Sequence, residues 1–323
     1  MTHRPWDVAW HDALYGPAGF YRRPEGPAGH FRTAAHASGR LGAALARLAR
    51  SSGCEAVVDV GAGRGELLVA VHAADADLDL TGVDVVPRPD DLPPAIAWSN
   101  AAPDAMTRTL LVGTELLDVV PCPVLEVGPD GEAHVVEVDR DGSERLGAPA
   151  GPADLRWAAR WWPTADPRAR IEVGRTRDEL WASLVHRVSD GLALAVDYGH
   201  TADRRPASGS LTGYRGGRQV APVPDGSSDL TAHVALDALV EVAPHGLLLT
   251  QAEALGRLGI GADRPSVGAA AGDPMAYLAA LSASSEAHEL LDPGGLGAFG
   301  WVLHPRGDAA SRLVTEWTHG APS

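Results

Sequence analysis

Short apolar runs alternate with segments of helical periodicity through the first third of the chain. Residues 55–60 (EAVVDV) form a β-branched run, and residues 66–74 (ELLVAVHAA) form an apolar helical segment after a glycine-rich loop. Strands that alternate with helices indicate βαβ units. We therefore expect an α/β fold with a mostly parallel sheet and helices on both faces. Three further apolar runs predict strands at residues 77–84, 95–98 and 107–115.

The pattern changes in the middle of the chain. Residues 123–147 hold two alternating runs around the turn sequence GPDG, which is typical of a β-hairpin. The parallel-strand pattern returns at residues 191–200 (GLALAVDYGH), and a last strand is expected at residues 297–305. We therefore expect an insertion over about residues 120–172. Residues 200–229 are rich in Gly, Pro, Ser and Arg, which predicts a long loop, and such loops are usually functional or mobile.

Local motifs mark the starts of three later helices. Thr176 with Glu179, and Thr250 with Glu253, have the spacing of capping boxes, in which each side chain satisfies the other residue's backbone amide. Pro274 follows an aspartate and suits the first position of a helix, where its missing N–H costs nothing. These motifs predict helices that begin close to residues 176, 250 and 274.

Composition limits the partners of the protein. The chain has 323 residues and a formal net charge of −15, and all 27 of its Lys and Arg residues are arginines. This acidic balance argues against nucleic-acid binding, because phosphate recognition needs a basic surface. No apolar run approaches the ~18 residues of a membrane span, and Trp6 and Asp7 interrupt the start of the chain, where a signal peptide would be apolar. We therefore expect a soluble, cytoplasmic protein that does not bind membranes.

Several chemistries lack the residues that they need. The absence of lysine excludes a Schiff-base lysine and a P-loop. Cys54 and Cys122 fit no CxxC motif, and the thirteen histidines show no HExxH spacing, so no metal site is predicted. No GxSxG elbow supports a hydrolase. His233 is the one histidine that we keep as a candidate for substrate binding.

The glycine-rich loop carries the strongest local signal. Gly61, Gly63 and Gly65 follow a β-branched strand and precede a helix, so the chain turns sharply and a ligand can approach its backbone. The dinucleotide fingerprint would have another glycine at position 66, where this chain has Glu66. The GxGxG spacing therefore favours S-adenosylmethionine over NAD or FAD. Asp84 ends the second strand, where a carboxylate can accept hydrogen bonds from both ribose hydroxyls.

Four further polar residues lie at the predicted carboxyl edge of the sheet. Glu115 and Asp118 follow the fourth strand, and Asp197 and Tyr198 finish the next one. Ligands bind at this edge in open α/β folds. Asp118 taken alone is better explained as an acid that favours the start of a helix. We expect Glu115 to act in catalysis, with Asp118 and Asp197 beside it and Tyr198 in contact with the substrate.

The chain resembles the MidA-like methyltransferases, which include a mitochondrial complex I assembly factor that methylates an arginine. Several blocks in the same order carry the resemblance, and they extend over most of the chain. They are ALYGPAGFYRRP (13–24), VVDVGAGRGELL (57–68), TELLDVVP (114–121), VDYGH (196–200), GSLTGYRGGR (209–218), SDLTAHVAL (228–236) and LTQAEALGRLGI (249–260).

The resemblance implies a class I (Rossmann-like) methyltransferase fold with an inserted substrate-side region. We expect residues 1–52 to form an N-terminal helical lead and residues 53–323 to form the S-adenosylmethionine-binding domain. The resemblance also implies that Glu115 lies near the transferred methyl group. Two departures concern Thr114, where the family usually has Asn, and Asp59, where it commonly has Glu. The predicted cofactor-binding residues are Asp59, Gly61, Ala62, Gly63, Gly65 and Asp84.

The acceptor implied by the resemblance is a protein arginine. A guanidinium is a poor nucleophile while charged, so Glu115 with Asp118 or Asp197 would hold it in a carboxylate fork and polarise one nitrogen. Tyr214, Arg215 and Arg218 lie in the long loop, which we expect to cover the acceptor, the alternative being an idle surface loop. Two other functions stay open: O- or N-methylation of a small molecule, and a non-catalytic S-adenosylmethionine-binding assembly factor. The oligomeric state does not follow from the sequence.

Overall fold

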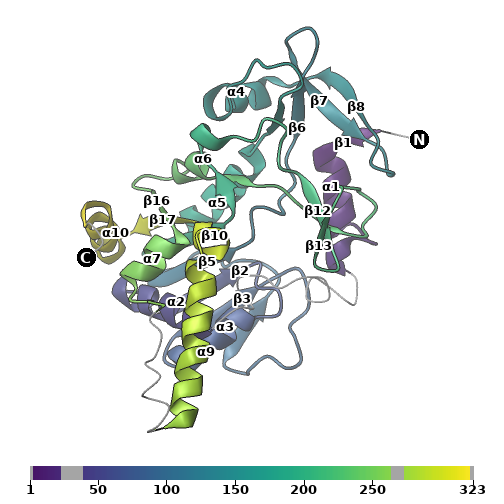
Figure 1. Cartoon of the computed structure of the whole chain (residues 1–323). Helices are drawn as coiled ribbons and strands as arrows, with labels where there is room; N and C mark the ends of the chain where they lie inside the picture. The colour runs from purple at the N-terminus through teal and green to yellow at the C-terminus, as the bar shows by residue number, and fades with distance from the viewer. Residues whose placement is uncertain (1–2, 23–38, 263–272, 321–323) are drawn as a thin grey trace. The chain divides into compact units, whose positions relative to one another are not determined.

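The structure is a computed structural model that describes residues 3–22, 39–262 and 273–320 (Figure 1). The chain forms two compact units, each built from separate stretches of sequence. The large-sheet unit comprises Thr33–Glu115, Val185–Val196 and Pro244–Ser323. The small-sheet unit comprises Met1–Arg32, Leu116–Leu184 and Asp197–Ala243.

A seven-stranded mixed sheet forms the centre of the large-sheet unit, in the order β16-β17-β10-β5-β2-β3-β4. β2 pairs in parallel with β3 on one side and β5 on the other, whereas β16 is antiparallel to β17. The strand order therefore reverses beside β2, which is where open α/β sheets bind ligands. The strands are β2 (Ala56–Val60), β3 (Asp79–Val83), β4 (Ile96–Ser99), β5 (Thr109–Thr114), β10 (Gly191–Asp197), β16 (Leu247–Thr250) and β17 (Gly300–Arg306).

Each strand predicted for this sheet is present, and its central strands β5 and β10 are buried on both faces. Successive residues of β5, Leu110 and Leu111, point to opposite faces, and both side chains are fully buried. β10 is buried along its whole length. Strands buried on both faces read as continuous apolar runs, which is why periodicity found them. β16 was not predicted, since its leucines run directly into the following helix.

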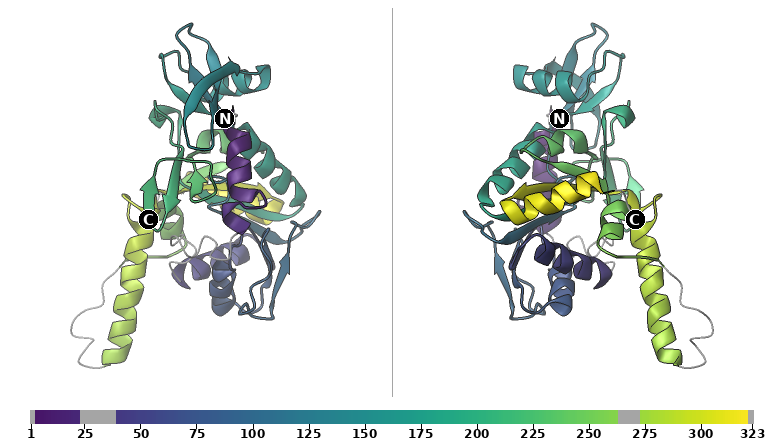
Figure 2. Two further views of the ribbon diagram at one scale, coloured as in Figure 1. Left: turned by 90° about the vertical axis from the view of Figure 1, so that its right-hand side faces the viewer. Right: turned by 90° about the vertical axis from the view of Figure 1, so that its left-hand side faces the viewer.

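Helices of this unit contribute buried apolar residues to one core with the sheet. Their ribbons can be followed in Figures 1 and 2; they are α2 (Gly39–Ser51), α3 (Glu66–Ala74), α7 (Gln251–Arg257), α9 (Pro274–Leu291) and α10 (Asp308–His319). The capping box of α7 is confirmed, because the Thr250 hydroxyl accepts from Glu253 N while the Glu253 carboxylate accepts from Thr250 N. α9 begins at Pro274 as predicted. None of the helices within the described residues has an apolar stretch long enough to cross a membrane.

The small-sheet unit has a five-stranded sheet, in which the predicted hairpin of β6 and β7 is confirmed as an antiparallel pair. Its first core cluster centres on Trp6 and Trp10 of α1, and a second includes Trp157 and Trp162. The elements are β1 (Arg4–Pro5), β6 (Val124–Val127), β7 (Ala133–Val138), β8 (Glu144–Pro149), β9 (Arg170–Glu172), α1 (Trp6–Tyr15), α4 (Pro152–Trp161), α5 (Arg175–Arg187), which begins in this unit, and α6 (Leu236–Val240).

Residues 200–229 are more ordered than the long loop that composition predicts. β12 (Thr212–Arg215) pairs with β13 (Arg218–Val220) and β14 (Asp229–Thr231), and the short β11 (Gly199–His200) pairs with β15 (Val234–Ala235). The buried carboxylate of Glu172 accepts hydrogen bonds from the backbone amides of Ser210 and Leu211, at 2.6 and 2.7 Å. This contact comes from a distant part of the sequence, so local composition could not reveal it.

Two other sequence expectations differ from the structure. The expected helical lead of residues 1–52 is divided, because α1 belongs to the small-sheet unit and α2 to the large-sheet unit. Thr176 does not cap α5, which begins one residue earlier, and its hydroxyl donates to the Pro121 carbonyl at 2.8 Å. In both cases packing with residues remote in sequence overrides the local signal.

Candidate functional site

The glycine-rich loop connects β2 to α3 and has the backbone that its glycines predict. Gly61, Gly63 and Gly65 have φ values of +78°, +58° and +81°, in the left-handed region that L side chains rarely adopt. The amides of Gly61 and Ala62 both donate to the Val83 carbonyl, at 2.9 and 3.2 Å. The loop is therefore fixed to the end of the neighbouring strand β3.

Asp84 follows β3 and contacts this loop directly. One carboxylate oxygen accepts from the Gly63 amide at 2.8 Å, and the other accepts from the Val86 amide at 3.1 Å. Burial raises the pKa of Asp84, and these amide hydrogen bonds oppose that shift. The structure thus brings Asp84 and the glycines together, as the sequence predicted. We call Asp59, Gly61, Ala62, Gly63, Gly65 and Asp84 the glycine-loop site.

Asp59 lies inside β2 beneath this loop and is 3% exposed. Burial raises its pKa to about 7, and the charges of Asp84 and Glu66 add to the rise. The three carboxyl groups therefore share one end of the sheet, and the most buried of them retains a proton into the neutral range. A site with this charge favours a ligand that carries positive charge.

Asp59→Asn is expected to stabilise the protein by a margin that grows as the pH rises from 5 to 8. In the unfolded chain the Asp59 carboxyl ionises near its ordinary pKa of 3.8, whereas in the folded protein it ionises near 7. The folded state therefore binds the extra proton between these values, and the free energy of unfolding falls as the pH rises through this window. Asn cannot ionise, so it avoids this loss.

Thermal unfolding of both proteins from pH 5 to pH 8 checks this prediction. We expect the variant to gain about 2–4 °C or more over wild type at pH 8. Asp79→Asn, at the exposed start of β3, is the matched control and should show no such trend. A stability difference that is constant with pH would contradict the prediction.

Glu115 follows β5 in the same unit and has an unusual backbone. Its φ is +50°, and its amide donates to the Val196 carbonyl of β10 at 2.8 Å. A glutamate in the left-handed region is strained, and such strain persists where the surroundings or a function require it. The side chain is half-buried. This conformation singles out Glu115 among the acids at the carboxyl edge of the sheet.

Asp118, Asp197 and Tyr198 belong to the small-sheet unit and contact one another there. One oxygen of Asp197 accepts from the amides of Leu117 and Asp118, at 3.0 and 3.2 Å. The Tyr198 hydroxyl donates to the Asp118 carboxylate. Burial raises the pKa of Asp118 to about 6, although the hydrogen bond from Tyr198 opposes the rise. Asp197 thus shapes the backbone of the segment after Glu115.

Sequence reasoning missed Arg177, which is 1% exposed and lies on α5. Its guanidinium donates to the carbonyl oxygens of Val120, Asp118, Ala232 and His233 at distances of 2.9–3.1 Å. Arg177 therefore joins the segment after Glu115 to the segment that carries His233. In the sequence it is one of many arginines, and no local signal distinguishes it.

The predicted substrate residues of the long loop share one β-hairpin. Tyr214, Arg215 and Arg218 are on the β12–β13 hairpin, where the arginines are exposed and Arg215 donates to Ser227 at 3.4 Å. His233, in contrast, lies against Tyr198, with ring centroids 5.2 Å apart. The structure therefore brings His233 and Tyr198 together, and it places Tyr214 opposite Asp229 of β14.

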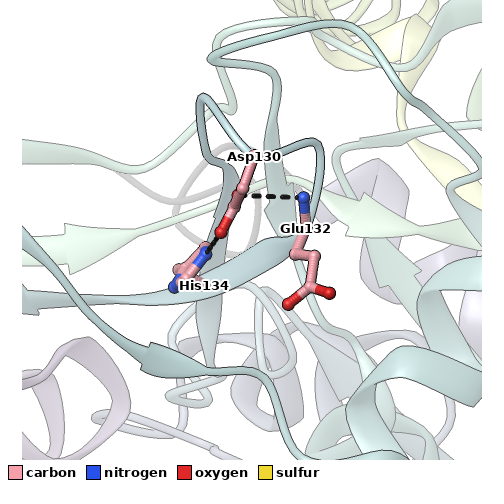
Figure 3. Close-up of side chains that lie close together, drawn as sticks. All are labelled: Asp130, Glu132 and His134. Carbon is pink, nitrogen blue, oxygen red and sulfur yellow. Dashed lines mark hydrogen bonds and ion pairs between the residues drawn. The ribbon is translucent and has the colours of Figure 1, made fainter.

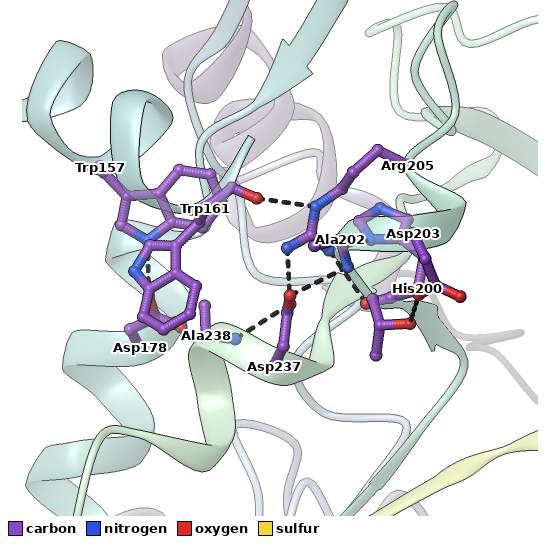
Figure 4. A network of polar contacts seen from close by, with 10 residues as sticks. Trp157, Trp161, Asp178, His200, Ala202, Asp203, Arg205, Asp237 and Ala238 are labelled. Carbon is purple, nitrogen blue, oxygen red and sulfur yellow. Dashed lines mark hydrogen bonds and ion pairs between the residues drawn. The ribbon is translucent and has the colours of Figure 1, made fainter. Parts of the chain in front are cut away.

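A second polar network connects α4, β11 and α6 around Arg205 (Figure 4). Arg205 donates to the Trp161 carbonyl at 2.9 Å, to Asp237 at 2.5 Å and to Nδ1 of His200 at 2.6 Å. Because a guanidinium only donates, Nδ1 of His200 accepts and Nε2 carries the proton. Burial, with the charge of Arg205, lowers the pKa of His200 to about 3. The network therefore holds the segment after Tyr198 against α4 and α6.

Asp130, Glu132 and His134 bring potential ligand atoms within 4.8 Å of one another at the β6–β7 turn (Figure 3). The contacts of Asp130 explain the arrangement, because it accepts from the Glu132 amide at 3.1 Å and pairs with His134 Nε2 at 2.9 Å. The hydrogen bond that His134 donates to the Asp130 carboxylate raises the pKa of His134. These side chains form a hydrogen-bonded turn.

Comparison with solved structures identifies the fold. A crystal structure of a Burkholderia thailandensis protein bound to S-adenosyl-homocysteine matches with a TM-score of 0.78 and 23% identity, over 96% of this chain and 90% of that chain. A native crystal structure of an uncharacterized protein from the same organism matches with a TM-score of 0.75 and 24% identity, over the same shares. A search of curated proteins finds no match.

A family model identifies the class of protein. The family described as "Putative S-adenosyl-L-methionine-dependent methyltransferase" matches residues 74–252, which is more than half of the chain. The match includes Asp84, Glu115 and Asp197, while the glycine loop precedes it. The chain therefore belongs to this family, and it is an S-adenosyl-L-methionine-dependent methyltransferase, as the sequence predicted.

Proposed function

We propose that this protein has a class I methyltransferase fold and transfers a methyl group from S-adenosyl-L-methionine to an arginine side chain of a protein. The observation that carries this proposal is the contact of Asp84 with the Gly63 amide in a loop with three left-handed glycines. That contact places a carboxylate beside a backbone that a ligand can approach, and the carboxylate can accept further hydrogen bonds.

The glycine-loop site fits a nucleoside donor. A Cβ added at Gly63 would meet no other atom within 4 Å, so this part of the loop has an open side. Asp84 would accept hydrogen bonds from the ribose hydroxyls. Val85, which sequence reasoning missed, is 63% exposed beside Asp84 and would offer apolar surface to the adenine ring. When bound, the donor's sulfonium supplies an activated methyl group.

Glu115 would contact the acceptor. A guanidinium has a pKa above about 12 and is a poor nucleophile while charged, and a carboxylate holds it through charge-assisted hydrogen bonds that orient one nitrogen. The strained backbone of Glu115, at the end of β5 in the unit that holds the glycine loop, supports this role. We assign Asp118 and Asp197 to positioning, because their hydrogen bonds shape the segment after Glu115. The net charge of −15 favours a cationic acceptor.

Asp84→Ala is expected to weaken donor binding by about 10- to 100-fold, because hydrogen bonds to a charged group contribute roughly 1.5–3 kcal/mol. Calorimetric titration of EDTA-treated protein with S-adenosylmethionine and with S-adenosylhomocysteine measures the effect. Asp79→Ala is the matched control at the opposite end of β3 and should bind like wild type. Equal affinity of Asp84→Ala and wild type would remove Asp84 from the site.

Isotope labelling identifies the acceptor. Host lysate is incubated with the protein and labelled S-adenosylmethionine, and the products are examined by mass spectrometry. Label on protein arginine supports the proposal. Label confined to small molecules would replace it with metabolite methylation. Donor binding without any labelled product would indicate a non-catalytic binding protein.

A further inference from the structure

Trp98 lies beside the glycine-loop site and has no role assigned so far. It is on β4, the edge strand next to β3, and its side chain is half-buried. Its indole Nε1 donates to the Val86 carbonyl at 3.1 Å. The amide of Val86 in turn donates to the Asp84 carboxylate at 3.1 Å. Trp98 and Asp84 therefore hold the same residue, one by its carbonyl and the other by its amide.

The indole ring also lies close to two backbone segments of the site, β3 and the glycine loop. A Cβ added at Gly82, on β3, would lie 2.4 Å from Cζ3 of Trp98, so glycine is needed there for the ring to pack. A Cβ at Gly65, the last residue of the glycine loop, would lie 3.5 Å from the same atom. The ring thus reaches from β4 across β3 to the glycine loop.

We propose that Trp98 is a positioning residue for the methyl donor. By holding the Val86 carbonyl it fixes the turn that presents Asp84 and the exposed Val85, and by packing on Gly82 and Gly65 it keeps this turn in register with the glycine loop. A site that is ordered before binding avoids the entropy cost of ordering itself around the ligand. This inference rests on the proposed donor site.

Trp98→Phe tests the hydrogen bond, since Phe keeps an aromatic ring and loses the N–H. We expect the dissociation constant for S-adenosylhomocysteine, measured by calorimetry, to rise by about 3- to 10-fold, as for the loss of one hydrogen bond. In the transfer reaction, KM for the donor should rise by a similar factor, while kcat changes by less than about twofold, because the contact is present before and during transfer.

Gly82→Ala tests the ring from the other side. The added Cβ would displace the indole while the Trp98 N–H and the Val86 carbonyl both stay in the chain, and donor affinity should fall in the same direction. Trp157→Phe is the matched control, because it removes a 2.7 Å indole hydrogen bond to Asp178 in the small-sheet unit. It should lose stability while its donor affinity stays at the wild-type value.

The outcomes separate this inference from the proposed function. Wild-type protein that binds neither donor nor S-adenosylhomocysteine would overturn the proposed function. Wild-type protein that binds, together with a Trp98→Phe variant of equal affinity, would overturn only the role of Trp98. Weaker binding in Trp157→Phe by the same factor would show a general effect of stability and would also overturn that role.

Discussion

Glu115→Gln should reduce the rate of methyl transfer by about 10²–10⁴-fold, the range expected for one positioned catalytic carboxylate. Gln keeps the size of the side chain but loses its charge, so a cationic acceptor loses its charge-assisted contact. Donor affinity should change by less than about twofold, because the proposed donor site is formed by the loops after β2 and β3, whereas Glu115 follows β5. Single-turnover transfer to the acceptor that isotope labelling identifies measures the rate. Calorimetric titration of the same variant with the donor measures the affinity.

Two further variants sharpen this experiment. Glu115→Gly removes the carboxylate and also relieves the left-handed φ of +50°. It should be as inactive as Glu115→Gln while keeping or gaining up to about 1 kcal/mol of stability, since the relieved strain offsets the entropy cost of glycine. Glu55→Gln, directly before β2, alters a surface pair with Arg108 and should transfer normally. Full activity in Glu115→Gln would leave the glutamate with no part in the reaction.

Arg177→Met is expected to lower the free energy of unfolding by about 3–5 kcal/mol, the loss typical of a disrupted buried charged network. Met preserves much of the apolar stem, but the carbonyls that Arg177 joins would lose their shared donor. Arg177→Lys should recover only part of the loss, because an ammonium cannot reproduce the planar fork of the guanidinium. Denaturant unfolding followed by tryptophan fluorescence measures the change.

The same helix supplies the control for Arg177. Arg175, two residues earlier, pairs with Asp154 and Glu179 and is about one-third exposed. Exposed ion pairs contribute about 0–1 kcal/mol, so Arg175→Met should cost no more than that. Equal losses in Arg175→Met and Arg177→Met would contradict the structural role of the buried guanidinium.

Those parts of the protein that depend on neighbours in the chain could be predicted from the sequence. The strand from Ala56, the glycine turn and helix α3 follow one another within a few residues, and each is set by periodicity or by a need for positive φ. The capping box of Thr250 and Glu253 is local in the same way. Asp84 was also predicted, because in a βαβ unit the ends of adjacent parallel strands meet at the same edge.

Only the tertiary structure decided the features that join distant residues. The left-handed φ of Glu115, the amides bound by Asp197 and the carbonyls joined by Arg177 all arise where segments far apart in sequence pack together. The segment that leads into β12 is likewise held by Glu172, from a distant part of the sequence. A polar side chain can satisfy its hydrogen bonds in many ways, and which way is used depends on the partners that folding brings within about 3 Å. Local pattern predicted the conformation of the glycine loop, while packing determined which of the remaining polar residues support the backbone.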